Sequence, residues 1–100
     1  MTEEVYVCQT DDIDEEDVRR FDYADQTYCV YHTPDGFFAT DGHCTHEEQH
    51  LEDGIVIDNV IECPLHQGRF DVRSGKALSA PVCVDLKTYP VVIRDGGIHL

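Results

Sequence analysis

The sequence predicts a single all-β domain. Its 100 residues leave room for one folding unit, with no space for a second core. Short runs of β-branched and aromatic residues alternate with turn signals along most of the chain, which is typical of antiparallel strands. No segment has the apolar periodicity of a helix of useful length, and there is no internal repeat. We therefore expect one all-β domain over residues 1–100.

The first part of the chain predicts a small antiparallel scaffold. Ala24 and Asp25 form a tight connection between two strands. The sequence Thr33-Pro34-Asp35-Gly36 predicts a turn, because proline presets one backbone dihedral and glycine allows a positive φ. We expect strands at residues 5–8, 18–23, 26–32 and 36–40.

An acidic segment lies between the first two of these strands. From Asp11 to Asp17, six of seven residues are acidic, and only Ile13 interrupts them. The segment is either a docking patch for a partner protein or a solvated turn with Ile13 packed inward. We favour the turn.

The second part of the chain predicts more hairpins. The apolar runs 55–57 and 60–62 are joined by Asp58-Asn59, which is a hairpin signature. Residues 69–72 alternate as a strand, and Ser74-Gly75 predicts a turn. Strands at 83–86, 89–94 and 98–100 are expected to complete the sheet.

Four candidate metal ligands lie on either side of the 55–62 hairpin. The first pair is Cys44-x-His46 and the second is Cys63-x-x-His66, with sixteen residues between the pairs. A Cys2His2 set can in principle hold one tetrahedral zinc, although zinc sites usually separate two cysteines by a short spacer and two histidines by another. Here each pair mixes one thiolate with one imidazole, which suits a [2Fe–2S] cluster with both cysteines on one iron and both histidines on the other.

At these residues the chain resembles the Rieske family, and the likeness covers nearly the whole sequence. The resemblance extends beyond the ligands to Leu51, Gly54, Gly68, Phe70 and Gly75, which stand at the family's offsets. It implies a Rieske fold, with an antiparallel β-sandwich or barrel-like base and a small cluster-binding subdomain of loops and a hairpin at about residues 41–81. A third loop containing Ala80-Pro81 is expected to cover the cluster.

The resemblance also assigns roles to the ligands. Cys44 and Cys63 are expected to hold one iron, and His46 and His66 the other, at the exposed tip where electrons enter and leave. It gives no ligand role to His43 or His50. Neutral imidazoles make the cluster less negative than an all-cysteine cluster, so it accepts an electron more readily.

Departures from the quinol-oxidising branch of the family identify a subgroup. Gln49 and Leu65 occupy the positions of that branch's loop cysteines, so the chain has no loop disulfide there. Gly68 and Phe70 replace the serine and tyrosine whose hydroxyls bond to sulfur. Losing those bonds is expected to lower the reduction potential toward about −150 mV. The resemblance is therefore to the soluble Rieske ferredoxins of bacterial ring-hydroxylating and related oxygenase systems.

This resemblance implies a one-electron carrier and not an enzyme. A flavin-containing, NAD(P)H-dependent reductase would reduce the protein, which would then dock on a terminal oxygenase. Two alternatives remain open. One is the Rieske-like small subunit of an assimilatory nitrite reductase, and the other is a metal-stabilised adaptor or redox sensor.

The charge and the cysteine content limit which partners and which cellular compartment we expect. The formal net charge of −14 argues against nucleic acid and anionic membrane as partners. Cys8, Cys29 and Cys83 remain after the ligands are assigned, and this odd number favours buried thiols over a disulfide framework. No apolar run is long enough to span a bilayer. We expect a cytoplasmic monomer that docks transiently.

Overall fold

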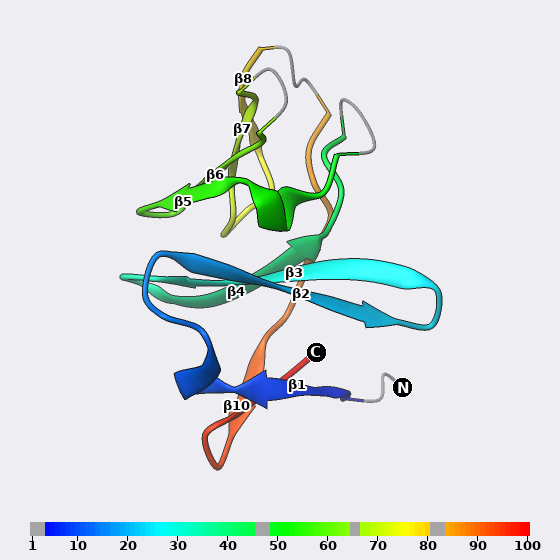
Figure 1. Ribbon diagram of the computed structural model, residues 1–100, viewed down its shortest axis with the longest axis vertical. Helices are drawn as coiled ribbons and strands as arrows, with labels where there is room; N and C mark the ends of the chain where they lie inside the picture. The colour runs from blue at the N-terminus through cyan, green and yellow to red at the C-terminus, as the bar shows by residue number, and fades with distance from the viewer. Residues whose placement is uncertain (1–3, 46–48, 65–66, 81–83) are drawn as a thin grey trace.

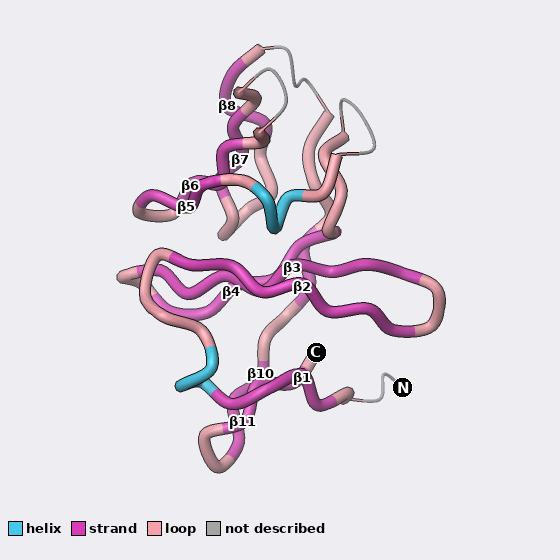
Figure 2. Tube along the Cα trace, in the orientation of Figure 1, coloured by secondary structure: helices cyan, strands magenta, loops and turns pink. Residues whose placement is uncertain are grey.

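Three small antiparallel sheets are stacked as tiers along the long axis of the molecule (Figure 1). The computed structural model describes residues 4–45, 49–64, 67–80 and 84–100. Strands joined by turns make up nearly all of these residues, with single 3₁₀ turns at Thr10–Asp12 and Leu51–Asp53 (Figure 2). No helix in the described ranges is long and apolar enough to cross a membrane. The predicted all-β class is confirmed.

The strand order in each tier follows from antiparallel pairing. The lower sheet contains, in spatial order, β1 (Tyr6–Gln9), β11 (Gly97–His99) and β10 (Val92–Arg94). The middle sheet contains β2 (Asp17–Tyr23), β3 (Gln26–Thr33), β4 (Gly36–Asp41) and β9 (Thr88–Tyr89). The upper sheet contains β5 (Ile55–Ile57), β6 (Val60–Glu62), β7 (Arg69–Asp71) and β8 (Ala77–Ser79).

The predicted turns fix the register of the middle sheet. Ala24 and Asp25 adopt φ values of 52° and 63° and join β2 to β3 with Tyr23 paired to Gln26. Gly36 has a φ of 129° at the start of β4, a conformation that favours glycine. The expected strand pairs of the scaffold are therefore confirmed.

Strand β3 is buried on both faces and separates two cores. Its Cys29 and Tyr31 face the upper core, whereas Val30 between them faces the lower core. This alternation follows from the two-residue period of a strand. The upper core contains Cys29, Tyr31, Cys44, Leu51, Val56, Ile61, Cys63, Phe70, Val72 and Leu86. The lower core contains Cys8, Ile13, Val30, Ala39 and Ile98.

Ile13, the only apolar residue of the acidic segment, packs in the lower core. Ile13 is 3% exposed, while its acidic neighbours from Asp11 to Asp17 are exposed. The predicted solvated turn with Ile13 packed inward is confirmed. Cys8 and Cys29 are buried on strands, as predicted, and Cys83 lies outside the described residues.

Two predicted strands are wrong near the C-terminus. Residues 89–94 do not form one strand: Tyr89 pairs with β4 in the middle sheet, and β10 starts at Val92 in the lower sheet. Pro90 lies at the break because it has no N–H to donate to a ladder. Residues 84–86 are not a strand either, and the Leu86 amide donates to the Gly75 carbonyl across 2.7 Å outside any strand ladder. Strand β8 was not expected from the sequence.

Candidate metal centre

The first ligand loop leaves the end of β4 through Gly42. The Gly42 amide donates to the Thr27 carbonyl across 2.8 Å, and a Cβ at Gly42 would lie 2.5 Å from Thr27 Cγ2. The Cys44 amide then donates to the Gln49 carbonyl across 2.9 Å. This bond closes the base of a loop that contains position 46. His46 itself lies outside the described residues.

The second ligand loop is closed in the same way. The Cys63 amide donates to the Gly68 carbonyl across 2.7 Å. In each loop the acceptor is therefore the carbonyl five residues after the cysteine, and the candidate histidine lies within the closed segment. Leu65 and His66 lie outside the described residues. The Cys63 closure occurs between the end of β6 and the start of β7, so the upper sheet sets the position of this loop.

A third segment joins the first ligand loop to strand β8. Thr45 Oγ1 donates to the Val84 carbonyl across 2.6 Å, which ties the first loop to the chain after the predicted proline loop. The Ala77 amide donates to Asp85 Oδ1 across 2.9 Å, so the neighbouring residue is fixed to β8. Pro81 lies outside the described residues. Three separate parts of the chain therefore converge at one end of the molecule (Figure 1).

Both candidate cysteine ligands are buried in one core. Cys44 is 6% exposed and Cys63 is 1% exposed, and both pack in the upper core with Leu51 and Phe70. Two soft thiols that are shielded from water, each at the base of a closed loop, fit the cysteine side of a Rieske cluster. No group of three or more His, Cys, Asp or Glu able to hold a metal is found within the described ranges, which do not include His46 and His66.

Cys29, which lies outside the ligand set, has an unreactive environment. Burial raises the pKa of Cys29 to about 12, so this thiol stays protonated at neutral pH. Burial also raises the pKa of Tyr31, whose hydroxyl lies 2.8 Å from Thr40 Oγ1. These polar groups satisfy one another beneath the ligand loops and do not offer a further thiolate ligand.

A charged chain runs from the middle sheet toward the first loop. Arg20 Nη1 donates to Glu52 Oε2 across 3.3 Å, and His50 Nδ1 lies 3.5 Å from the same oxygen. The His50 ring in turn lies against the His43 ring, with centroids 4.6 Å apart. His43 precedes the candidate ligand Cys44, so this row of side chains, from Arg20 to His43, supports the loop from outside. His43 and His50 also form an isolated antiparallel β-bridge at the base of the loop.

The positions at which this protein differs from the quinol-oxidising branch lie at the bases of the ligand loops and in the upper core. Gln49 and Gly68 supply the two loop-closing carbonyls, which depend on the backbone and not on the side chain. Phe70 is fully buried in the upper core with both cysteines. An aromatic ring without a hydroxyl fits this apolar position.

Sequence patterns missed the residues that tie the loops together. Thr45, Glu52 and Asp85 each bond to a partner at least eight positions away. No local spacing identifies such a contact.

Comparison with known proteins gives a consistent family assignment. The chain is 47% identical over 81 residues to the ferredoxin component of the 2,4-dinitrotoluene dioxygenase system of Burkholderia sp. (strain RASC), covering 81% of this chain and 78% of that protein. It is 37% identical over 98 residues to the 3-phenylpropionate/cinnamic acid dioxygenase ferredoxin subunit of Photorhabdus laumondii subsp. laumondii, covering 97% and 92%.

A solved structure extends this similarity to three dimensions. A chain in the complex of reduced oxygenase and oxidized ferredoxin in carbazole 1,9a-dioxygenase superimposes with a TM-score of 0.92 at 33% identity, over 96% of this chain and 90% of that one. Residues 3–90 match the family described as Rieske [2Fe-2S] domain. With two buried cysteines at the base of matched loops and a family match over most of its length, this chain belongs to the Rieske [2Fe-2S] domain family.

Proposed function

We propose that this chain is the one-electron carrier between an NAD(P)H-dependent flavin reductase and a terminal oxygenase. The observation that carries the proposal is the 47% identity to the ferredoxin component of a dioxygenase system. A carrier of this kind transforms no substrate itself. We place the carrier in the cytoplasm and expect it to act as a monomer that docks transiently on its partners.

The proposed ligands are Cys44 and Cys63 on one iron and His46 and His66 on the other. The bound cluster supplies reversible one-electron chemistry at a potential suited to a flavin donor. The described residues contribute burial and position. Burial of Cys44 and Cys63 keeps water from their thiolates. The Thr45 hydrogen bond to Val84 holds the first loop against the neighbouring segment.

The proposed organisation is one domain over residues 1–100, with about 41–81 as the cluster-binding part. The upper sheet and its loops bind the cluster, while the lower and middle sheets form the base. Because the ligands come from two loops that are far apart in sequence, removal of the cluster is expected to loosen the upper tier before the base.

Spectroscopy tests the cofactor assignment directly. The purified holoprotein should be EPR-silent when oxidised and give a rhombic signal with a low mean g after dithionite reduction. Cys63→Ser should abolish the signal and the visible absorption, whereas Cys29→Ser should retain both. A colourless, silent protein that contains zinc would contradict both the site and the carrier function.

Turnover tests the partners. The holoprotein, mixed with the reductase and oxygenase of the 2,4-dinitrotoluene dioxygenase system, should support NADH-dependent oxygenation, and omission of the chain should abolish it. If the protein is reduced but fails in turnover, and if it instead co-purifies as a fixed subunit of a reductase, the nitrite reductase alternative takes precedence.

A further inference from the structure

The upper sheet has an apolar outer face as well as an apolar inner face. Its inward side chains, including Val56, Ile61 and Phe70, pack in the upper core. Its outward side chains Ile55, Ile57 and Leu78 are 57%, 60% and 49% exposed. A sheet that faces water on one side normally carries polar residues on that side. The exposed isoleucines are therefore unusual for a surface with no partner.

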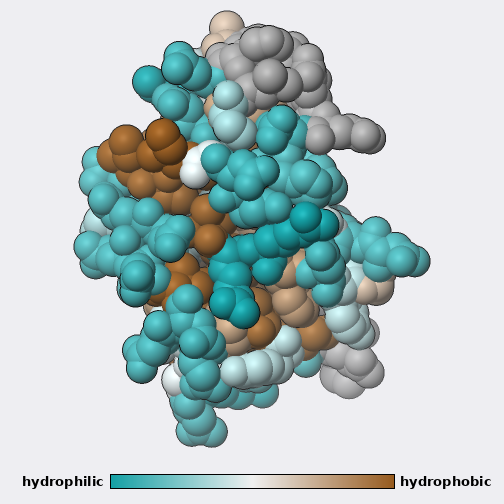
Figure 3. Space-filling view, viewed as in Figure 1, coloured by the Kyte–Doolittle hydropathy of each residue, from teal (hydrophilic) through white to brown (hydrophobic). Residues whose placement is uncertain are grey.

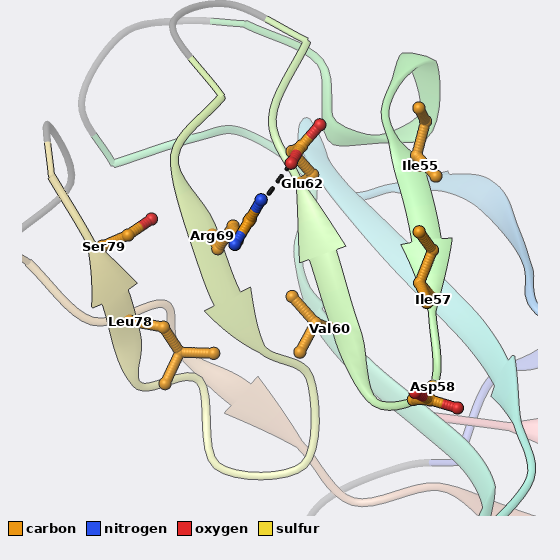
Figure 4. Close-up of a pocket in the computed structure, with 8 residues that line it drawn as sticks. All are labelled: Ile55, Ile57, Asp58, Val60, Glu62, Arg69, Leu78 and Ser79. Carbon is orange, nitrogen blue, oxygen red and sulfur yellow. Dashed lines mark hydrogen bonds and ion pairs between the residues drawn. The ribbon is translucent and has the colours of Figure 1, made fainter.

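These side chains line a groove of about 440 Å³. In Figure 4, Ile55 and Ile57 on β5 lie on one side of the hollow and Leu78 on β8 lies on the other, and the Glu62–Arg69 ion pair joins the two middle strands. Figure 3 shows an apolar patch over the β5–β6 hairpin that is bordered by hydrophilic residues. The lining residues are Ile55, Ile57, Asp58, Val60, Glu62, Arg69, Leu78 and Ser79.

Uncompensated charge around the groove is negative. Arg69 Nε lies 3.0 Å from Glu62 Oε1, so the one basic residue in the lining is already paired. Asp58 has no ion-pair partner within the described ranges, and its amide donates to Glu16 Oε1 across 3.1 Å. This bond brings the acidic segment that ends at Asp17 to the edge of the groove. A partner therefore needs apolar side chains with lysine or arginine beside them.

The groove borders the proposed metal centre. Glu62, in the lining, directly precedes Cys63, and Ser79 is the last residue of β8 before the predicted proline loop. A protein seated in the groove would lie next to the second ligand loop. The groove could thus orient a partner without covering the tip through which electrons leave.

We propose that this groove, formed by the outer face of β5–β8, docks a basic protein partner of the electron-transfer chain. It accepts an apolar patch that is flanked by lysine or arginine side chains. This inference rests on the proposed carrier function and adds a second contact surface beside the tip. A second copy of the chain is a poor occupant because each copy brings the same acidic edge and a net charge of −14.

The test uses a cytochrome c as a defined basic acceptor. Such a cytochrome carries lysines around an exposed apolar haem edge, and one electron passes from the dithionite-reduced holoprotein to its ferric haem. The assay needs only a reducible cluster. A failure of turnover with the oxygenase would therefore leave its result intact, so failure of the docking surface and failure of the proposed function can be told apart.

Two pairs of variants separate apolar contact from charge. The double variant I55T/I57T keeps β-branched residues on the strand and should lower the second-order rate constant roughly tenfold. I93T, on the exposed face of β10 in the lower sheet, is the matched control and should leave the rate unchanged. Both proteins should retain the visible and EPR spectra of the wild type, which excludes a general folding defect.

Charge is tested by a second matched pair. E16Q/D58N should flatten the dependence of the rate on salt, whereas D25N/D95N removes as many charges elsewhere and should flatten it less. Asp25, Asp58 and Asp95 share positive φ values, which asparagine tolerates, so backbone strain is matched. Equal rates for I55T/I57T and I93T would overturn the proposal. So would wild-type dimerisation, measured by sedimentation, that I55T/I57T abolishes.

Discussion

The Cys63 amide donates to the Gly68 carbonyl across 2.7 Å, and this one bond closes the second ligand loop at its base. The Cys44 amide makes the corresponding bond to Gln49. Both candidate cysteines thus have their main chain fixed to the protein body at the base of a closed loop. The stability of a cluster held by two such loops should depend on the contacts that tie the loops to the rest of the protein.

The contact between Thr45 and Val84 is the first that can be tested. T45V keeps the shape of the side chain and removes the hydroxyl that donates to the Val84 carbonyl. We expect a loss of about 1 kcal/mol, which corresponds to roughly fivefold faster loss of the cluster to an iron chelator. Visible absorbance measures that rate. T88V, on β9 in the middle sheet, is the control, and equal rates for both variants would contradict a role for Thr45.

The close approach of Gly54 to β6 leaves no space for a side chain at this position. A Cβ at this residue would lie 2.2 Å from the Glu62 carbonyl oxygen, directly before Cys63 in the chain. G54A should therefore shift β6, lower the free energy of unfolding by about 1–3 kcal/mol and reduce the iron content. Chemical denaturation and metal analysis measure both effects.

G97A provides a graded control for G54A. A Cβ at Gly97 would meet its nearest neighbours at 3.2 Å, so a smaller adjustment accommodates it. We expect a smaller loss of stability and a full iron content for this variant. If G97A lost as much iron as G54A, the close approach to Glu62 would not be the cause.

The absence of a hydroxyl at Phe70 is expected to affect the reduction potential of the cluster. The residue is fully buried with Cys63 in the upper core. A hydroxyl at this position that donates to a ligand sulfur should stabilise the added electron. F70Y is expected to raise the potential by roughly 20–60 mV, the equivalent of one hydrogen bond in a one-electron couple. Protein-film voltammetry measures the shift.

A control distinguishes sulfur bonding from general polarity. F38Y adds a hydroxyl to a half-buried ring that packs against the same core from β4. Its potential should stay near that of the wild type. A drop in stability of F70Y without any change in potential would mean that the new hydroxyl is buried without reaching sulfur.

Local patterns were sufficient for most of the fold. The turn at Ala24-Asp25 and the Asp58-Asn59 hairpin depend on residues that adopt positive φ or favour turns, so short-range chemistry predicts them. The ligand spacing likewise predicted the kind of cofactor, and the family match confirms it. The two buried cysteines agree with that prediction.

Long-range contacts explain what the sequence did not predict. The run from Tyr89 to Arg94 is aromatic and β-branched on both sides of Pro90, but its ends pair with different sheets. Residues 84–86 have the same propensity, yet Leu86 bonds to Gly75 instead of a ladder. The outer groove also has no local signal, because Ile57 and Leu78 are distant in sequence and line one groove only when the strands β5 to β8 assemble into a sheet.

The ion pair between Asp71 and Arg73 predicts a pH-dependent stability. Hydrogen bonds from the Arg73 guanidinium lower the pKa of Asp71, with Nη2 3.0 Å from Oδ2. A carboxyl with a lowered folded pKa stabilises the protein above its unfolded pKa of about 3.9, and this stabilisation is lost as pH falls through the folded value. R73Q should therefore melt at a lower temperature than the wild type at pH 7, and the difference should shrink as the pH is lowered toward 4 and below.

K76Q removes a positive charge nearby, and its difference from the wild type should change less over the same range. A gap between R73Q and wild type that stays constant from pH 7 into the acid range would show that Arg73 acts through packing and not through the Asp71 carboxylate.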